Sequence, residues 1–353
     1  MKRNEQRSRV LQALHRENED YIPFDFILCP SLYEQFKTKT GETDYREFYD
    51  IPVRFIEAPQ TGNRNKFFGY FKEDPGKLTI DNFGVGSKPG SLAHFSAMVH
   101  PMESMQKLSE FKEYPYPVPE DWDWSAFETN SARLKENGRV VAAGLAMTIF
   151  EIAWYMRGMD RFMMDMMTEP ELAEYHMDRI TEIRCRSAAE YAGRGADILF
   201  LGDDVATQRG MMMSPEMWRR FLKPRLREVI RCAKKINPEI MIDYHSDGDA
   251  SEIVGELIEI GVDILNPVQP ECMDPGELKR LYGTELTFHG TIGTQTTMPF
   301  GTPDEVRWVC KKMMETVGAG GGLLLAPTHV LEPEVPWINI EAMIETIRER
   351  NGK

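Results

Sequence analysis

The sequence is poor in cysteine and lacks closely spaced cysteine pairs. Its 353 residues include five cysteines, and none of them forms a Cys-x-x-Cys pair. So small and dispersed a set excludes the disulfide framework of a secreted domain and fits a chain kept in a reducing compartment. The cysteines are Cys29, Cys185, Cys232, Cys272 and Cys310.

Long apolar runs and an excess of positive charge are also missing. No run is long enough to span a bilayer, and the polar start MKRNEQRSRVLQALHREN lacks the apolar core of a signal peptide. With 42 Lys and Arg against 56 Asp and Glu, the net charge is −14. This balance argues against nucleic acid or an anionic membrane as the main partner. We therefore predict a soluble, acidic protein of the cytoplasm.

Short apolar segments alternate with amphipathic segments through most of the chain. From residue 139 onward, strands are predicted at RVVAAGL, ADILFLG, EIMIDYH, VDILNPVQ, LTFHGTI and GGLLLAPTHV, each followed by a helix. Such strands indicate a parallel sheet covered on both faces. Adding YIPFDFIL and the 79–84 region makes eight strands. The count predicts an α/β fold, a single (β/α)8 TIM barrel over residues 1–353.

A doubly wound open sheet is the alternative architecture. Such sheets carry a glycine-rich phosphate loop between a strand and a helix, whereas GAGGG at 318–322 precedes a strand and predicts a turn. The barrel is therefore favoured. Residues 60–125 are rich in Gly, Pro and aromatic residues and show little periodicity. We predict that they form an excursion of long loops, with a hairpin near GKLTIDNFGVG, over the barrel mouth.

Polar side chains recur where the predicted strands end, which is where a barrel carries its active site. Three of the seven histidines fall there, beside carboxylates and a thiol. One histidine at such a place is more often a hydrogen-bonded rim or core residue, but three at one mouth favour a zinc site. The set comprises Asp203, Asp204, His245, Asp247, Asn266, Gln269, Cys272, His289, Gln295 and His329.

Methionine is in excess, with 22 residues, several of them in MTIFEIAWYMRGMDRFMMDMM. Apolar residues at helical spacing usually pack in a core. This stretch directly follows a predicted strand, so its first turn is expected to overhang the mouth. An aromatic substrate could stack there on Met147, Phe150 and Trp154. Asn266, Gln269 and Gln295 complete the predicted substrate-binding set.

Long blocks of the sequence resemble the uroporphyrinogen decarboxylase superfamily. They are GDDVATQRGMMMSPEMWRRFLKPR, YHSDG, IGVDILNPVQPECMDPGELK, FHGTIGTQTTMPFGTPDEV and LLLAPTHVLEPEVPW. More narrowly, they look like the branch of corrinoid-dependent methyltransferases, including methyltransferase I of aryl methyl ether O-demethylase systems. The resemblance implies a TIM barrel that exchanges methyl groups with a corrinoid. No cobalamin-binding module is visible in the chain, so the corrinoid (cobalamin) is expected on a partner protein.

The sequence departs from the decarboxylases themselves. In that group, arginines after the first strand bind the carboxylates of the substrate. Here no arginine occurs between Arg16 and Arg46. A porphyrinogen with its many carboxylates would meet an acidic protein without this clamp, so decarboxylation is not expected.

The sequence also departs from the thiol-methylating relatives, in which a His-x-Cys pair and a later Cys bind zinc. The pair reads His245-Ser246-Asp247 here, and the later position falls near Thr328 and His329. Zn²⁺ with these harder ligands keeps more positive charge and is the stronger Lewis acid toward oxygen. This replacement favours demethylation of an ether over methylation of a thiol.

A second spacing, D-x27-C-x39-C, joins Asp204, Cys232 and Cys272 and is similar to a zinc motif of aryl methyl ether methyltransferases. Cys232 comes late in the helix predicted over 214–236, toward the bottom of the barrel, whereas the other two belong at the top. We therefore interpret Cys232 as a buried small hydrophobic residue. The predicted zinc ligands are Asp204, His245, Cys272 and His329, with Asp247 left open. The predicted catalytic set is Asp204, His245 and His289.

These observations predict a zinc-dependent methyltransferase that demethylates a small donor, an aryl methyl ether, and passes the methyl group to the Co(I) corrinoid of a separate protein. The 60–125 excursion is the expected docking rim for that partner. The alternatives are a methylcobamide:thiol or pterin methyltransferase, a decarboxylase of the same superfamily, and a non-catalytic binder of the corrinoid protein.

Overall fold

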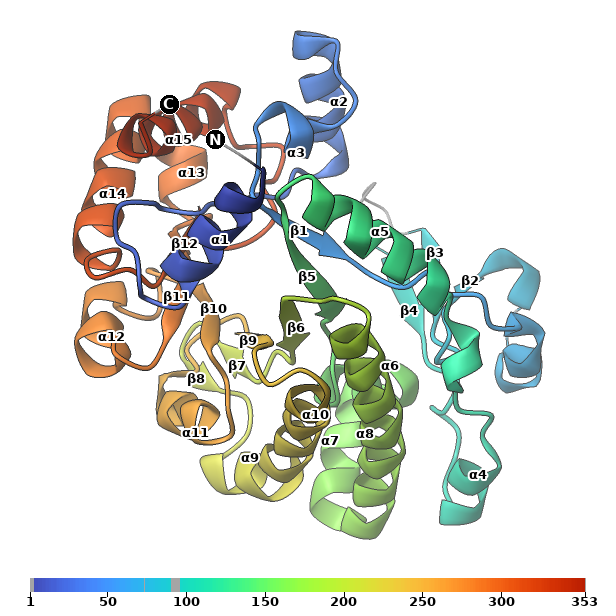
Figure 1. Ribbon diagram of the computed structural model, residues 1–353. Coiled ribbons are helices and arrows are strands. Elements are labelled where there is room, and N and C mark those ends of the chain that lie inside the picture. Colours follow the sequence, from blue (N-terminus) through green and yellow to red (C-terminus); the bar gives the residue numbers. More distant parts are fainter. Residues whose placement is uncertain (1–2, 73, 90–95, 353) are drawn as a thin grey trace.

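Seven parallel strands form one curled sheet at the centre of the molecule (Figure 1). The computed structural model describes residues 3–72, 74–89 and 96–352. Each strand pairs in parallel with its neighbours in the order β1-β5-β6-β9-β10-β11-β12. The strands are β1 Val53–Ile56, β5 Val140–Leu145, β6 Ile198–Gly202, β9 Met241–His245, β10 Ile264–Val268, β11 Thr287–Ile292 and β12 Leu323–Pro327. The predicted α/β class and barrel-like architecture are confirmed.

The two segments that completed the predicted count of eight strands adopt other structures. YIPFDFIL forms two isolated parallel bridges, Phe24 with Leu325 of β12 and Leu28 with Leu331, which lies beyond the end of β12. The 79–84 region lies outside the barrel in an antiparallel sheet of β2 (Thr79–Ile80), β3 (Gly86–Pro89) and β4 (Ser96–Val99). The predicted hairpin near GKLTIDNFGVG is therefore confirmed. The prediction that the 79–84 region supplies a strand of the barrel is wrong.

The strand that sequence reasoning missed is β1, VRFI. Its apolar pattern is interrupted by Arg54, which is buried with an exposed fraction of 5%. The guanidinium donates to the backbone oxygens of Ile51 and Arg46 and to the carboxylate of Glu47. A strand can bury an arginine when hydrogen bonds satisfy its guanidinium. The groups that do so here meet Arg54 only after folding, so the sequence pattern does not reveal the strand.

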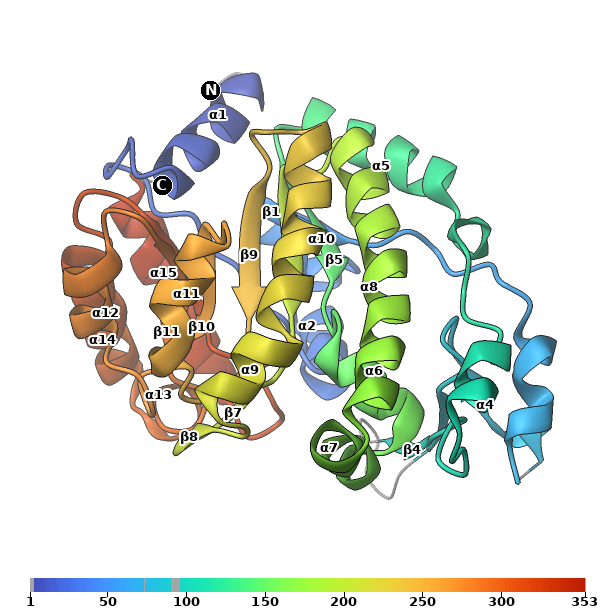
Figure 2. The ribbon, with the colours of Figure 1, turned by 90° about the horizontal axis from the view of Figure 1, so that it is seen from below.

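Helices cover the outer face of the sheet (Figures 1 and 2). The helices of the described chain, including α1 at the end of the barrel and α4 in the 60–125 segment, are α1 Arg3–Leu14, α2 Pro30–Thr40, α3 Tyr45–Phe48, α4 Leu108–Glu113, α5 Trp124–Glu136, α6 Phe150–Arg157, α7 Met159–Thr168, α8 Pro170–Gly193, α9 Pro215–Phe221, α10 Lys223–Ile236, α11 Val254–Glu259, α12 Pro275–Tyr282, α13 Thr297–Phe300, α14 Pro303–Thr316 and α15 Trp337–Arg350. Within the described ranges, none of them has the length and apolarity needed to cross a bilayer.

Short elements complete the chain: 3-10 helices at Arg64–Tyr70, Pro75–Lys77, Pro119–Asp121 and Ser251–Ile253, and a hairpin of β7 (Ala206–Thr207) and β8 (Gly210–Met211). The predicted helix over 214–236 begins at its expected cap, where Ser214 accepts a hydrogen bond from the amide of Met217. It is divided into α9 and α10 at Leu222, and Pro224 lies in the first turn of α10.

Helix α1 closes the end of the barrel at which the strands begin. Its apolar face, Val10, Ala13 and Leu14, is fully buried. It packs in one cluster with the first residues of the strands, among them Val53, Val140, Ile198, Met241 and Ile264. A larger core fills the space between the sheet and the outer helices. The carboxyl ends of the strands are thus the end left for a ligand.

The excursion of residues 60–125 lies along the outside of the barrel, beside α6 and α8 (Figure 2). The guanidinium of Arg157 on α6 donates to the carbonyls of Met102 and Met105. The hydroxyl of Tyr116 lies 2.7 Å from Nδ1 of His176 on α8. The described residues of this segment do not line the cavities at the strand ends. That the excursion covers the mouth therefore stays a prediction, and residues 73 and 90–95 lie outside the described residues.

Candidate functional site

A cavity of about 440 Å³ opens at the carboxyl ends of the strands. Four residues of the predicted site line it, namely His245, Asn266, His289 and His329. A smaller cavity of about 220 Å³ adjoins it, because both are lined by His329 and Val330. Gln269, Gln295 and Asp247 line the second cavity. Seven of the ten polar residues predicted at the strand ends thus line these adjoining cavities, whereas Asp203, Asp204 and Cys272 do not.

Two carboxylates and one imidazole form a cluster at this mouth. Nε2 of His245 lies 3.6 Å from Oδ1 of Asp204 and 3.8 Å from Oδ1 of Asp247. One donor atom from each residue lies within 4.8 Å of the other two. The amide of Asp247 donates to Oδ1 of Asp204 over 2.8 Å, which holds the two carboxylates side by side. Nitrogen and oxygen donors at this spacing fit a divalent cation such as Zn²⁺.

Asn266 determines which nitrogen of His245 faces the cluster. Nδ1 of His245 lies 2.6 Å from the side-chain oxygen of Asn266, which is buried. An amide oxygen only accepts, so Nδ1 carries the proton and the lone pair lies on Nε2. The lone pair is therefore on the nitrogen beside Asp204 and Asp247. Histidines that bind metals in proteins are held in this way.

The other predicted zinc ligands lie outside this trio. Nε2 of His329 is 4.0 Å from Oδ2 of Asp247, and the side chain is about half exposed at 53%. Cys272 is near enough for the charge of Asp247 to act on it but does not join the cluster. Burial, together with the carboxylates of Asp249, Glu271 and Asp247, raises the pKa of the Cys272 thiol to about 11. Without a cation beside it, this thiol is protonated near neutral pH.

The residues of the D-x27-C-x39-C spacing do not meet. Cys232 lies on α10 beside Cys185 of α8 and Glu228, and these three form a separate cluster. The prediction that Cys232 is buried is wrong, since its side chain is only half-buried and its Sγ lies 3.9 Å from Oε1 of Glu228. Figure 2 shows α8 and α10 side by side on the outside of the sheet.

Aromatic rings connect two histidines of the larger cavity. The ring of Phe55 is nearly parallel to His289, with centroids 6.2 Å apart, and meets Phe200 edge-on at 5.2 Å. Phe200 in turn lies 5.7 Å from the ring of His245. All four residues line the cavity. Sequence reasoning missed Phe55 because β1 was missed, and Phe200 because it lies within an apolar strand.

His289 is held by a buried carboxylate. Its Nδ1 lies 2.9 Å from Oδ2 of Asp243, which is fully buried on β9. Oδ1 of Asp243 has no hydrogen-bond partner in the described part of the chain. The contact with Asp243 therefore fixes the orientation of the His289 ring at the cavity wall.

Two further carboxyl groups line the cavity. Desolvation raises the pKa of buried Asp25 to about 6 and also raises the pKa of Glu57. A Cβ added at Gly144 would lie 2.6 Å from Oε1 of Glu57, so the glycine leaves room for the carboxylate. Both acids were missed because one lies inside the apolar run YIPFDFIL and the other follows β1.

The neighbouring carboxylates Asp203 and Asp204 lie in different surroundings. Asp203 is buried and accepts hydrogen bonds from the amides of Ile149 and Glu151 at the start of α6. Burial, with the charges of Asp203 and Asp204, raises the pKa of Glu151 to about 8. Because its hydrogen bonds cap α6, Asp203 has a structural role. Asp204 is the carboxylate that joins the cluster at the mouth.

The apolar residues predicted to overhang the mouth do not line either cavity. Phe150 is fully buried and packs against Phe162 with ring centroids 5.9 Å apart. Trp154 packs edge-on against Tyr155, and Met147 is exposed. The capping of α6 by Asp203 orients the first turn of that helix, and Phe150 points into the core. Ala146, the residue immediately before this stretch, lines the larger cavity.

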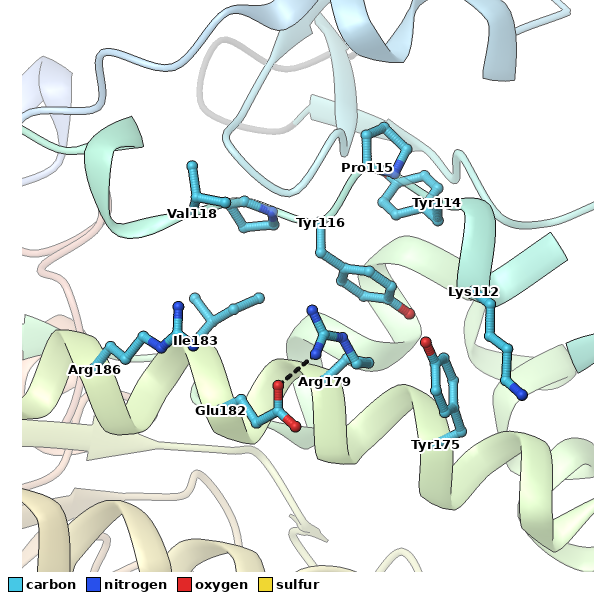
Figure 3. A pocket seen from close by; sticks show the side chains of 11 residues that line it. Lys112, Tyr114, Pro115, Tyr116, Val118, Tyr175, Arg179, Glu182, Ile183 and Arg186 are labelled. Carbon is cyan, nitrogen blue, oxygen red and sulfur yellow. Dashed lines mark hydrogen bonds and ion pairs between the residues drawn. The ribbon is translucent and has the colours of Figure 1, made fainter. Parts of the chain in front are cut away.

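A separate groove of about 250 Å³ lies outside the barrel between α8 and residues 112–118 (Figure 3). Figure 3 shows Tyr116 and Tyr175 facing one another across it, with Arg179 paired to Glu182 at 2.5 Å. None of the predicted site residues lines it. We therefore place the candidate site at the strand ends.

Known proteins resemble this chain in both fold and sequence. A solved methyltransferase from Methanosarcina mazei superposes with a TM-score of 0.71 over 98% of both chains, at 18% identity. The methylcobamide:CoM methyltransferase MtaA of Methanosarcina barkeri is 27% identical over 183 residues, 52% of this chain and 50% of its own length. A methylated-thiol–coenzyme M methyltransferase of Methanosarcina mazei is 26% identical over 204 residues, 54% and 53% of the two chains.

The matched stretch spans about half the length of these curated relatives. A longer match covers residues 85–350, which correspond to the family described as Uroporphyrinogen decarboxylase (URO-D). This range contains the cluster of Asp204, His245 and Asp247, as well as His289 and His329. The chain therefore belongs to the uroporphyrinogen decarboxylase family, as its sequence blocks predicted.

Proposed function

We propose that this protein is a methyltransferase that moves a methyl group from a small methylated donor to the cobalt(I) corrinoid of a separate protein. The observation that carries the proposal is the cluster of Asp204, His245 and Asp247 at the strand ends, beside an aromatic cavity. The similarity to two methyltransferases, one of them named for methylcobamide, supports the corrinoid as the other reactant.

Asp204, His245 and Asp247 would hold a zinc ion, with His329 beside them as the next candidate ligand. A bound zinc ion supplies Lewis acidity toward an oxygen atom of the donor. Asn266 keeps the lone pair of His245 on Nε2. Cys272, also predicted as a ligand, lies outside the trio, so its contribution is a separate question for experiment.

The proposed donor is an aryl methyl ether. Phe55 and Phe200 present an aromatic wall to the cavity, and Asn266, Gln269 and Gln295 offer polar contacts at the mouth. In the proposed reaction the methyl–oxygen bond breaks, and the methyl group passes to the partner's cobalt(I). The phenolate left behind takes a proton from His289, which Asp243 holds in place.

Methyl transfer to a thiol is the second candidate. The two relatives named for coenzyme M favour it. The ligand cluster opposes it, because the trio at the mouth consists of carboxylates and imidazole. Such a set leaves more positive charge on the metal than thiolates would and suits oxygen donors better.

The test mixes the zinc-loaded protein with a reduced corrinoid protein and a panel of methyl ethers, methylamines and methylated thiols. Absorbance follows the change from cobalt(I) to methyl-cobalt(III). We expect turnover with an ether and its loss in the His245→Ala variant. Transfer from methylcobalamin to a thiol, without transfer from any ether, would contradict the proposal.

A further inference from the structure

Two carboxyl groups and three histidines are the titratable groups among the described residues that line the larger cavity. Asp25 and Glu57 line it, and none of its described lining residues is Lys or Arg. Burial raises the pKa of Glu57, and the positive charge of Arg184 acts in the opposite direction. Its guanidinium donates to the carbonyls of Met147 and Thr148 and does not line the cavity.

The two acids differ in their surroundings but share one property. The carboxyl group of Asp25 receives a backbone hydrogen bond from Phe26. Glu57 makes no side-chain hydrogen bond or ion pair within the described residues, and its carboxylate occupies the space that Gly144 leaves above β5. Each carboxyl group therefore retains lone pairs for a hydrogen-bond donor on a ligand.

We propose that this cavity selects methoxyphenols and rejects methoxybenzoates. The inference rests on the proposed function and names the donor class within it. A phenolic hydroxyl on the ring donates to the carboxylate of Glu57 or Asp25, while Phe55 and Phe200 contact the ring face. A ring carboxylate placed against Glu57 and Asp25 would instead meet like charges, and none of the described lining residues is a Lys or Arg that could pair with it, which costs affinity.

The size of the cavity agrees with a one-ring donor. A volume of about 440 Å³ lies in the range of pockets for small organic ligands. A porphyrinogen carrying several carboxylates meets both a small cavity and the wrong charge. The same two acids thus oppose the substrate after which the family is named.

Direct binding tests the selectivity apart from turnover. Calorimetry at pH 8, where Asp25 is ionised, compares 2-methoxyphenol with 4-hydroxy-3-methoxybenzoate on the purified protein. We expect the methoxyphenol to bind at least about tenfold more tightly. Glu57→Gln and Asp25→Asn should each strengthen binding of the benzoate and so reduce the ratio of the two affinities. Glu42→Gln, at an exposed position away from the cavity, should leave this ratio unchanged. Equal affinities, a preference for the benzoate, or no binding of either compound would overturn the proposal.

The transfer assay then separates this inference from the proposed function. If the methoxyphenol binds selectively but no methyl group reaches the corrinoid protein, the selectivity stands and the proposed function fails. If both ethers are demethylated with similar kcat/KM, the proposed function stands and the selectivity is wrong. Both variants are checked by circular dichroism, so that a folding defect is not taken for a change in specificity.

Discussion

The side-chain oxygen of Asn266 lies 2.6 Å from Nδ1 of His245, and this contact fixes the face that the imidazole offers to the two carboxylates. Replacing Asn266 by Leu removes the acceptor and frees the ring to rotate. We expect the affinity for Zn²⁺ to fall roughly 10–100-fold, measured by competition with a chromophoric chelator. Asn266→Asp keeps an oxygen acceptor and should stay within a few-fold of the wild type. An unchanged affinity in the Leu variant would show that Asn266 does not support the site.

The proposed zinc ligands can be tested by single substitutions. Asp204→Asn and Asp247→Asn each remove one charged donor from the trio and should reduce the zinc content of protein dialysed against a weak chelator. Cys232→Ser should retain full zinc, because Cys232 lies beside Cys185 and Glu228. Metal content is read by mass spectrometry. Loss of zinc in the Cys232 variant alone would contradict the assignment.

Cys272 lies near the trio without joining it, and its substitution has a clear expected outcome. Cys272→Ser should leave both zinc content and zinc affinity within a few-fold of the wild type, because the three donors at the mouth come from other residues. The chelator competition used for Asn266 gives the measurement. A loss comparable to that of Asp204→Asn would show that the thiol moves into the site when the cation binds.

Closure of the barrel by α1 predicts a large effect on stability at one position. Leu14 is fully buried among the first residues of the strands. Leu14→Ala should lower the free energy of unfolding by about 2–5 kcal/mol through lost burial and a cavity. Leu281 is 48% exposed, and Leu281→Ala should cost less than about 0.5 kcal/mol. Urea unfolding measures the free energy of unfolding of both variants. Equal losses of stability would argue against tight packing of α1 at the end of the barrel.

His176 gives the stability a specific pH dependence. Nδ1 meets the hydroxyl of Tyr116 and Nε2 lies 3.1 Å from the carbonyl of Ala153, so the buried ring is neutral. Burial lowers its pKa from 6.5 to about 4. The unfolded chain therefore binds a proton below pH 6.5 that the folded chain takes up only near pH 4, and stability is lost as pH falls through this window.

The contribution of His176 is isolated by comparing the wild type with His176→Gln. Because other groups titrate in the same range, the quantity of interest is the difference between their unfolding free energies at each pH. This difference should shift against the wild type by up to roughly 3 kcal/mol between pH 7 and 4. A difference that is constant with pH would show that His176 titrates normally in the folded protein.

Six strands of the sheet could be predicted because each is an apolar run buried on both faces. β1 could not, since the partners that neutralise Arg54 are brought to it only by folding. The run YIPFDFIL has the composition of a strand, but its pairing depends on β12, which lies far along the chain. The composition of a segment indicates that it can be buried. Whether it forms the backbone hydrogen bonds of a strand depends on the neighbouring segment with which it pairs.

The candidate site shows the same division. Asp204, His245, Asn266 and His329 could be placed together because a parallel barrel brings its strand ends to one edge. Phe150 could not be placed, because the bonds from Asp203 to the start of α6 set the direction of that helix. Asp25 was missed because it lies inside an apolar run, and Phe55 and Glu57 were missed because β1 was not predicted. Positions at the ends of regular strands are predictable, and those on irregular neighbours are not.

Helix α1 packs on the first residues of the strands, and the cavity opens at their carboxyl ends. Under the proposed function, a small donor and the corrinoid protein would both reach the cavity from this end, and the docked partner would block the entry of the donor. The donor therefore has to be inside before the partner arrives, and the demethylated product is released only after the partner has left. Under the proposed function the two reactants bind in compulsory order. An excess of the reduced corrinoid protein should slow turnover by trapping the empty barrel.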